Sequence, residues 1–118
     1  MAILRGEVYF VELGPTRGKE IDIKRRPVVV LSINDINFKP LVVTVIPGGT
    51  RSSEQRVFRH EVKVEPSAAN GLKYSTIFQC FQIKAIDHGR FDAAPVGRIS
   101  PGDLLKIETT VKLCLGLP

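Results

Sequence analysis

The sequence predicts a mainly β protein in which one helix packs on a small, strongly bent sheet or barrel. Short β-branched runs, separated by turn-forming residues, fill most of the chain. After Ser100 the hydrophobic spacing changes to that of an amphipathic helix. No linker, internal repeat or low-complexity stretch interrupts the 118 residues, so we expect one domain over residues 1–118.

The expected strands are apolar runs with clear boundaries. Val8–Leu13 is apolar at nearly every position, which is typical of a strand buried on most of both faces. Pro47-Gly48-Gly49 is expected to end a later strand, Asn34–Asn37 to form a turn or one helical turn, and Arg90–Ile99 to hold a short strand and a loop. The other expected strands are Val28–Leu31, Leu41–Ile46, Val62–Glu65, Tyr74–Phe81 and Ile83–Ile86, of which the last two are alternatively one long, bent strand.

The C-terminal segment carries the start, face and stop signals of a helix. Ser100 suits the N-cap, Pro101 the first helical position, Asp103 the capping box and Gly116 the C-cap. The apolar face repeats at three- and four-residue spacing, at Leu104, Ile107, Val111 and Cys114.

The chain is basic, with 17 Lys and Arg against 12 Asp and Glu and a formal net charge of +5. This excess favours an anionic partner, of which nucleic acid is the commonest. The sequence has neither a signal-peptide pattern nor a stretch of transmembrane length, so we expect a cytoplasmic protein without membrane contact. Cys80 and Cys114 lie in apolar segments and are expected to be buried free thiols.

Few residues offer metal or nucleophile chemistry. His60 and His88 stand in separate polar segments, and nothing supplies the closely spaced ligands of a zinc site. The segment Pro47–Thr50 lacks the lysine and the following helix of a phosphate-binding loop. We therefore expect no metal and no cofactor.

Two arginines stand at the mouth of a β-branched run. Pro27 biases Arg26 toward an extended backbone, so Arg26 is expected to enter a buried strand at its N-terminal edge. A guanidinium fixed there is an always-charged fork suited to phosphate. The alternative is a solvated pair of charges ahead of a strand.

A cationic site of this kind can cleave RNA without a metal, because the 2′-hydroxyl is a built-in nucleophile. Arg26 would stabilise the charge that develops on the phosphoryl oxygens, and a hydroxyl such as that of Thr50 would position the phosphate. The alternative for Thr50 is a hydrated loop. The residues expected to contact the RNA backbone are Arg17, Lys19, Lys24, Arg25, Arg51 and Ser52.

Several motifs follow one another along nearly the whole chain. They are R-G-E-V-Y at 5–9, L-G-P-T-R-G-K-E at 13–20, R-P-V-V-V at 26–30, S-T-I at 75–77 and Q-I-K-A-I-D at 82–87. In order and spacing they resemble the MazF/PemK (Kid) family of toxin endoribonucleases.

The resemblance implies an SH3-like, twisted antiparallel barrel with a C-terminal helix. It implies a homodimer that cleaves single-stranded mRNA at short sequences without a metal, leaving a 2′,3′-cyclic phosphate and a 5′-hydroxyl and so inhibiting translation. It also implies a cognate antitoxin whose acidic tail occupies the RNA groove.

The resemblance carries over residue by residue. Arg26 matches the family's catalytic arginine, and Thr50 is the hydroxyl nearest to a family Thr or Ser whose place here is taken by Ile46-Pro47. Some members have a His at Lys19 and an Arg and an Asp at Gln79 and Phe81. Gln79 and Gln82 are expected to contact bases or to hold the loop, the alternative being ordinary strand polarity.

Two other interpretations stay open. A gyrase poison of the CcdB type has the same fold, but it would need an aromatic end to the helix, and this chain has no Trp and ends Leu115-Gly116-Leu117-Pro118. A catalytically degenerate member that only binds RNA or antitoxin is favoured by Ile46-Pro47, Gln79 and Phe81.

Overall fold

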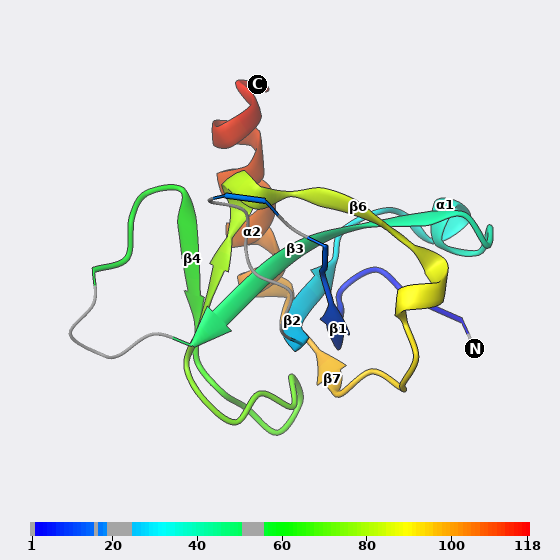
Figure 1. Cartoon of the computed structure of the whole chain (residues 1–118). Helices are drawn as coiled ribbons and strands as arrows, with labels where there is room; N and C mark the ends of the chain where they lie inside the picture. Colours follow the sequence, from blue (N-terminus) through cyan, green and yellow to red (C-terminus); the bar gives the residue numbers. More distant parts are fainter. Residues whose placement is uncertain (1, 16, 19–24, 51–55) are drawn as a thin grey trace.

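The computed structural model describes residues 2–15, 17–18, 25–50 and 56–118, which form a curled antiparallel sheet with a helix against one face (Figure 1). The strands are β1 (Glu7–Glu12), β2 (Arg25–Val30), β3 (Val42–Thr50), β4 (Glu61–Val64), β5 (Thr76–Gln79), β6 (Lys84–Asp87) and β7 (Gly97–Arg98). The helices are α1 (Asn34–Asn37) and α2 (Pro101–Leu115), with single 3₁₀ turns at Cys80–Gln82 and His88–Arg90.

Strand β3 is the centre of the sheet. The strand order is β4-β5-β3-β2-β1-β7, and β6 pairs with the first half of β3. Every pair is antiparallel, and β3 changes partners along its length: residues 42–45 pair with β6, 45–47 with β2 and 48–50 with β5. The sheet therefore curls around β3 into a half-barrel, which confirms the predicted fold class.

The prediction that Pro47-Gly48-Gly49 ends the strand is wrong, because β3 continues to Thr50. Pro47 lies opposite Val28, at the point where β3 leaves β2 and joins β5. Proline and glycine are tolerated in strands at such bends. A Cβ atom on Gly48 would lie 2.8 Å from Cδ1 of Phe78, so a glycine there lets β5 approach closely.

Two other strand boundaries also differ from the prediction. β2 begins at Arg25 rather than Val28, so both arginines belong to the strand, opposite Glu12 and Val11 of β1. Pairing with β1 therefore continues through the two arginines. The run Tyr74–Phe81 is a strand only over β5, and the 3₁₀ turn that follows separates it from β6.

The sheet is buried on both faces, as the unbroken apolar runs predicted. Neighbouring residues of β1 enter different clusters: Val8 packs with helix α2 on one face, whereas Tyr9 and Val11 belong to a second cluster on the other face. The ring of Tyr9 meets that of Phe91 edge-on, with 5.0 Å between centroids. The strands that carry the candidate site are thus fixed from two sides.

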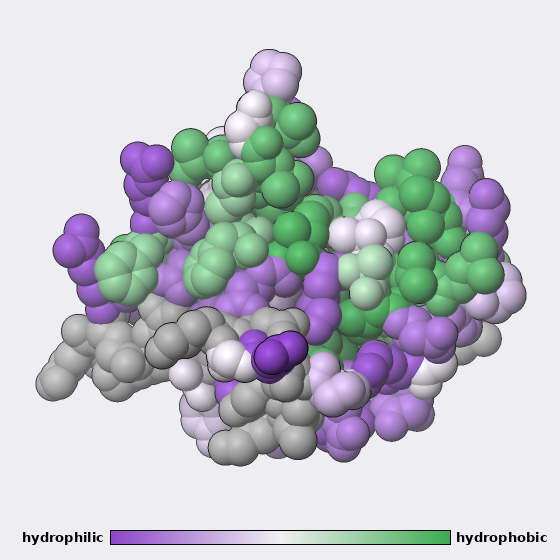
Figure 2. Space-filling model, turned by 45° about the horizontal axis from the view of Figure 1, so that its top comes forward, coloured by the Kyte–Doolittle hydropathy of each residue, from purple (hydrophilic) through white to green (hydrophobic). Residues whose placement is uncertain are grey.

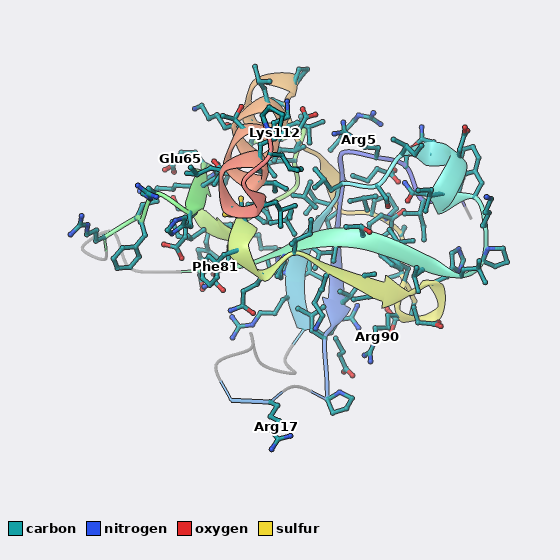
Figure 3. The ribbon with its side chains drawn as sticks, turned by 90° about the horizontal axis from the view of Figure 1, so that it is seen from above. Arg5, Arg17, Glu65, Phe81, Arg90 and Lys112 are labelled. Atoms are coloured by element: carbon teal, nitrogen blue, oxygen red, sulfur yellow. The ribbon has the colours of Figure 1, made fainter. Side chains whose placement is uncertain are left out.

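Helix α2 has the predicted signals. The Ser100 hydroxyl accepts a hydrogen bond from the Asp103 N–H at 3.1 Å, and Gly116 ends the helix with φ 68°. Ile107 and Val111 are buried against the sheet. At the outer edge, Arg5 donates to Glu108 at 2.9 Å and so ties the N-terminal segment to the helix (Arg5 is labelled in Figure 3).

Both cysteines are free thiols, as predicted, but only Cys80 is fully buried. Burial raises the pKa of the Cys80 thiol to about 12, whereas Cys114 is only partly covered. In the described part of the chain, no helix combines the length and the apolar character that a membrane crossing requires.

Replacing Ile107 by Ala should destabilise the protein by about 2–5 kcal/mol, because it opens a cavity between α2 and the sheet. Thr109→Ala, at an exposed position of the same helix, is the control and should change stability by less than about 0.5 kcal/mol. Urea unfolding measures both. Equal stability of the two variants would contradict the described packing of α2.

Candidate nucleic-acid interface

A pocket of about 450 Å³ opens where β2 begins, β3 ends and β5 begins. The connection between β4 and β5, which extends below the strands in Figure 1, contributes its far wall. Its size lies within the range of about 300–1,000 Å³ that is usual for ligand sites. The lining residues are Phe10, Arg25, Arg26, Pro27, Gly49, Thr50, Gly71, Leu72, Lys73, Tyr74, Thr76 and Val96.

Arg26 is held in this pocket by the strand it belongs to. It is half-buried and lies opposite Val11, while Pro27, next along β2, faces Phe10 across the same pair of strands. A Cβ atom on Gly49 would lie 2.9 Å from Nη1 of Arg26, so the guanidinium rests against the bare backbone of β3. The extended, strand-edge position predicted for Arg26 is confirmed.

Thr50 lies in the same pocket as Arg26. It is the last residue of β3, is exposed, and pairs with Thr76 of β5. The sequence predicts that Thr50 lies a few residues beyond the strand, whereas β3 extends to Thr50, directly after the Gly49 that Arg26 contacts. The pocket therefore combines a fixed cation with a hydroxyl.

Arg25 borders the pocket and is oriented by an ion pair. Its guanidinium donates to the two carboxylate oxygens of Asp92 at 3.1 and 3.2 Å and to the Phe10 carbonyl at 2.7 Å. The same pair lowers the pKa of Asp92 and raises that of Arg25. An exposed pair of this kind adds little stability, but it fixes a positive charge at the rim.

The other predicted backbone contacts lie on two connections of the chain. Arg17 is exposed in the connection between β1 and β2, and its side chain points away from the sheet (Figure 3). Lys19, Lys24, Arg51 and Ser52 fall outside the described residues.

Gln79 and Gln82 do not line the pocket of Arg26. Gln82 donates to the Gln79 side chain at 3.2 Å, and Gln79 lines a second pocket of about 580 Å³ at the other end of β5. The second pocket also has Phe58, His60, Glu61, Phe81, Leu113 and Cys114 in its lining. Arg26 and Gln79 therefore line separate pockets.

Several residues of the first pocket could not be identified from the sequence, among them Phe10, Lys73 and Tyr74. The apolar run Val8–Leu13 predicts a strand buried on most of both faces, yet Phe10 is 36% exposed and lines the pocket. Lys73 and Tyr74 precede β5 in a connection without a recognisable motif, and both line the pocket. Only the fold brings them to Arg26.

Whether the described residues can bind a metal ion depends on how their ionisable side chains are grouped. Within residues 2–15, 17–18, 25–50 and 56–118, no group of three or more His, Cys, Asp and Glu residues could hold a metal ion. The lining of the pocket offers two guanidinium groups, one amine, hydroxyl groups and apolar surface.

Sequence comparison relates the chain to toxins of toxin–antitoxin systems. Residues 4–115 match the model of PemK-like, MazF-like toxins of type II toxin–antitoxin systems. Endoribonuclease MazF9 of Mycobacterium tuberculosis is 32% identical over an alignment of 118 positions, which covers 96% of each chain. A putative toxin of the same organism is 31% identical over 115 residues, covering 98% of this chain and 99% of the relative.

Solved structures show the same fold. MazF from Deinococcus radiodurans has a TM-score of 0.82 at 20% identity, and the match covers 99% of each chain. A mycobacterial endoribonuclease in complex with its cognate antitoxin has a TM-score of 0.74 at 24% identity, covering 99% of this chain and 96% of that one. Since the family model spans residues 4–115, the chain belongs to the PemK-like, MazF-like family of type II toxin–antitoxin toxins.

Proposed function

We propose that this protein is a toxin endoribonuclease that cleaves single-stranded mRNA in the cytoplasm at short sequences, without a metal ion. One observation carries the proposal: the Arg26 guanidinium, the bare backbone of Gly49 and the Thr50 hydroxyl share one open pocket. The family supports it, as does the endoribonuclease name of a relative that is 32% identical.

The proposed reaction needs no cofactor. The 2′-oxygen, after losing its proton to a base, attacks the adjacent phosphorus, and the bond from phosphorus to the 5′-oxygen breaks as that oxygen gains a proton. The products are a 2′,3′-cyclic phosphate and a 5′-hydroxyl. Arg26 stabilises the negative charge that grows on the phosphoryl oxygens, and Thr50 donates a hydrogen bond to one of them.

The remaining polar residues are proposed to bind the RNA on either side of the cleaved bond. Cations neutralise phosphates, so binding should weaken as salt increases. Amide side chains suit the edges of unstacked bases. Because Gln79 lines a different pocket from Arg26, the bases that it would contact lie away from the cleaved bond. The proposed backbone contacts are Arg17, Lys19, Lys24, Arg25, Arg51 and Ser52, and the proposed base contacts are Gln79 and Gln82.

A cognate antitoxin is the proposed second partner. The net charge of +5 and the cationic pocket favour an acidic segment that competes with RNA. Structures of mycobacterial and Deinococcus relatives in complex with antitoxins support this proposal. Adding the antitoxin should release a fluorescent RNA from the protein; simultaneous binding of both would contradict a shared pocket.

We also propose a homodimer. Apolar side chains are exposed around the C-terminal end of α2, where Figure 2 shows a continuous hydrophobic surface. They include Phe58, Phe81, Leu113, Leu115 and Leu117. Light scattering should give twice the 13.0 kDa of one chain, and Leu113→Glu should reduce that mass toward one chain. A wild-type mass of one chain would contradict the dimer.

The cleavage test compares the wild type with Arg26→Ala on a long single-stranded RNA in the presence of EDTA, with the cut ends mapped. We expect discrete cuts by the wild type and a rate about 10²–10³ times lower for Arg26→Ala, because charge stabilisation is lost. Thr50→Ala should lower the rate less. Lys39→Ala removes one positive charge near α1, at the opposite end of β3 from Thr50, and should cleave normally.

The outcomes separate the interpretations. Cleavage by Arg26→Ala at the wild-type rate would place the site elsewhere, and loss of cleavage only in EDTA would mean that a metal takes part. RNA left intact by the wild type would favour the degenerate binding module or the gyrase poison, and a gyrase assay would then distinguish these two.

A further inference from the structure

By their chemistry, the residues that line the pocket of Arg26 divide into two sets, which we call its cationic half and its apolar half. The cationic half also carries a hydroxyl and consists of Arg25, Arg26, Thr50 and Lys73. The apolar half includes Phe10, Leu72, Tyr74 and Val96. A phosphate needs only the first half. The second half is suited to a flat, apolar group joined to that phosphate.

We propose that the apolar half binds one unstacked nucleobase of the RNA, with Tyr74 as the surface on which the base stacks. This inference rests on the proposed function and adds to it a binding site for the nucleotide whose phosphate contacts Arg26. Proteins that bind single-stranded nucleic acid commonly use exposed aromatic rings beside cations in this way. The volume of about 450 Å³ accommodates a nucleotide.

Tyr74 is presented to solvent by a well-fixed segment. Tyr74 is 68% exposed, so its ring is accessible to a ligand. The Thr76 hydroxyl donates to the Tyr74 carbonyl at 3.0 Å, which fixes the backbone directly before β5. Tyr74 therefore lines the pocket from an ordered backbone and is largely open to solvent.

The loop before Tyr74 is anchored to the body of the protein. Gly71 has φ +70°, and a Cβ atom there would lie 2.0 Å from the Val96 carbonyl oxygen, so only glycine permits this close approach. Asn70 accepts from the Leu72 N–H at 3.0 Å and donates to the Glu65 carbonyl at 2.9 Å. A stacking surface on an anchored loop loses little entropy when the base binds.

The chemistry of the lining indicates how the base is recognised. Among the described lining residues there is no carboxylate and no side-chain amide, the groups that read cytosine and adenine edges, and the cations that could read guanine belong to the half that we assign to phosphate. The second aromatic ring, Phe10, is 36% exposed, and its carbonyl accepts from Arg25 at the pocket rim. We infer that the pocket requires the aromatic face of a base more than it requires one particular base.

The test crosses protein variants with abasic RNA. The substrate is a short single-stranded RNA that contains the mapped cut sequence, with a 2′-deoxy sugar at the cut to prevent cleavage. Abasic sugars replace the nucleotides one at a time. Fluorescence anisotropy gives Kd for the wild type, Tyr74→Ala and Tyr74→Phe. Phe38→Ala removes a ring that is 59% exposed near α1 and serves as the control.

We expect Tyr74→Ala to raise Kd about 5- to 150-fold, the usual effect of losing one base–aromatic stack. An abasic sugar at one nucleotide beside the cut should raise the wild-type Kd similarly. Tyr74→Ala with the abasic RNA should have a Kd no higher than either change gives alone, since both changes remove the same contact. Tyr74→Phe and Phe38→Ala should bind like the wild type, and swapping the base at that position should change Kd less than removing it.

The proposal would be overturned if the Kd increases from Tyr74→Ala and from the abasic sugar multiply when the two are combined. An unchanged Kd for Tyr74→Ala would overturn it as well. If no mapped cut exists because the RNA stays intact, the proposed function fails, but the same scan over any RNA that binds still tests the stacking contact. A Tyr74→Ala protein that cleaves with normal kcat and normal KM would overturn the base site and leave the proposed function standing.

Discussion

The structure depends on the bare backbone of β3 at Gly48 and Gly49. At this point β3 stops pairing with β2 and begins to pair with β5, and side chains of both neighbouring strands contact its backbone. Phe78 packs on Gly48 and the Arg26 guanidinium rests on Gly49, and a methyl group added at either glycine would lie 2.8 or 2.9 Å from these side chains. The same pair of glycines therefore lets the sheet curl and lets a cation lie at the end of β3.

This arrangement couples the core to the candidate site. β2 carries Arg26 to the pocket, and Val28 and Val29 of the same strand are buried on opposite faces of the sheet. The strand thus fixes the backbone of Arg26, and the bare backbone of Gly49 leaves space for its guanidinium; charge stabilisation requires such preorganisation. The hydroxyl of Thr50 is placed by the same strand that carries Gly49.

Much of this architecture can be read from residue patterns. The caps and the apolar face of α2 follow from Ser100, Gly116 and the spacing of Ile107 and Val111, because these signals act within a few residues. The turn residues at Pro47-Gly48-Gly49 were misread, because a proline followed by glycines ends a strand locally, whereas here tertiary pairing with β5 continues it. That one difference moves Thr50 into the pocket.

The aromatic half of the pocket was beyond sequence reasoning for a similar reason. Tyr74 comes from the connection before β5 and Phe10 from β1, and nothing in either local sequence indicates that the curl of the sheet brings both to Arg26. Arg26 itself was predictable because the proline that follows it dictates an extended backbone. Local rules thus identify the cation, and long-range pairing supplies the rest of the site.

The most direct test of this account is RNA cleavage by Gly49→Ala, which keeps every proposed site residue but places a methyl group 2.9 Å from Nη1 of Arg26. Gly102→Ala, where a Cβ atom would meet open space, is the control. The account predicts that Gly49→Ala folds, because the flexible guanidinium can yield, but cleaves at least about tenfold more slowly, as misplacing a charge-stabilising group costs rate. Cleavage at the rate of the Gly102→Ala control would contradict the claim that Arg26 must rest on the bare backbone of β3.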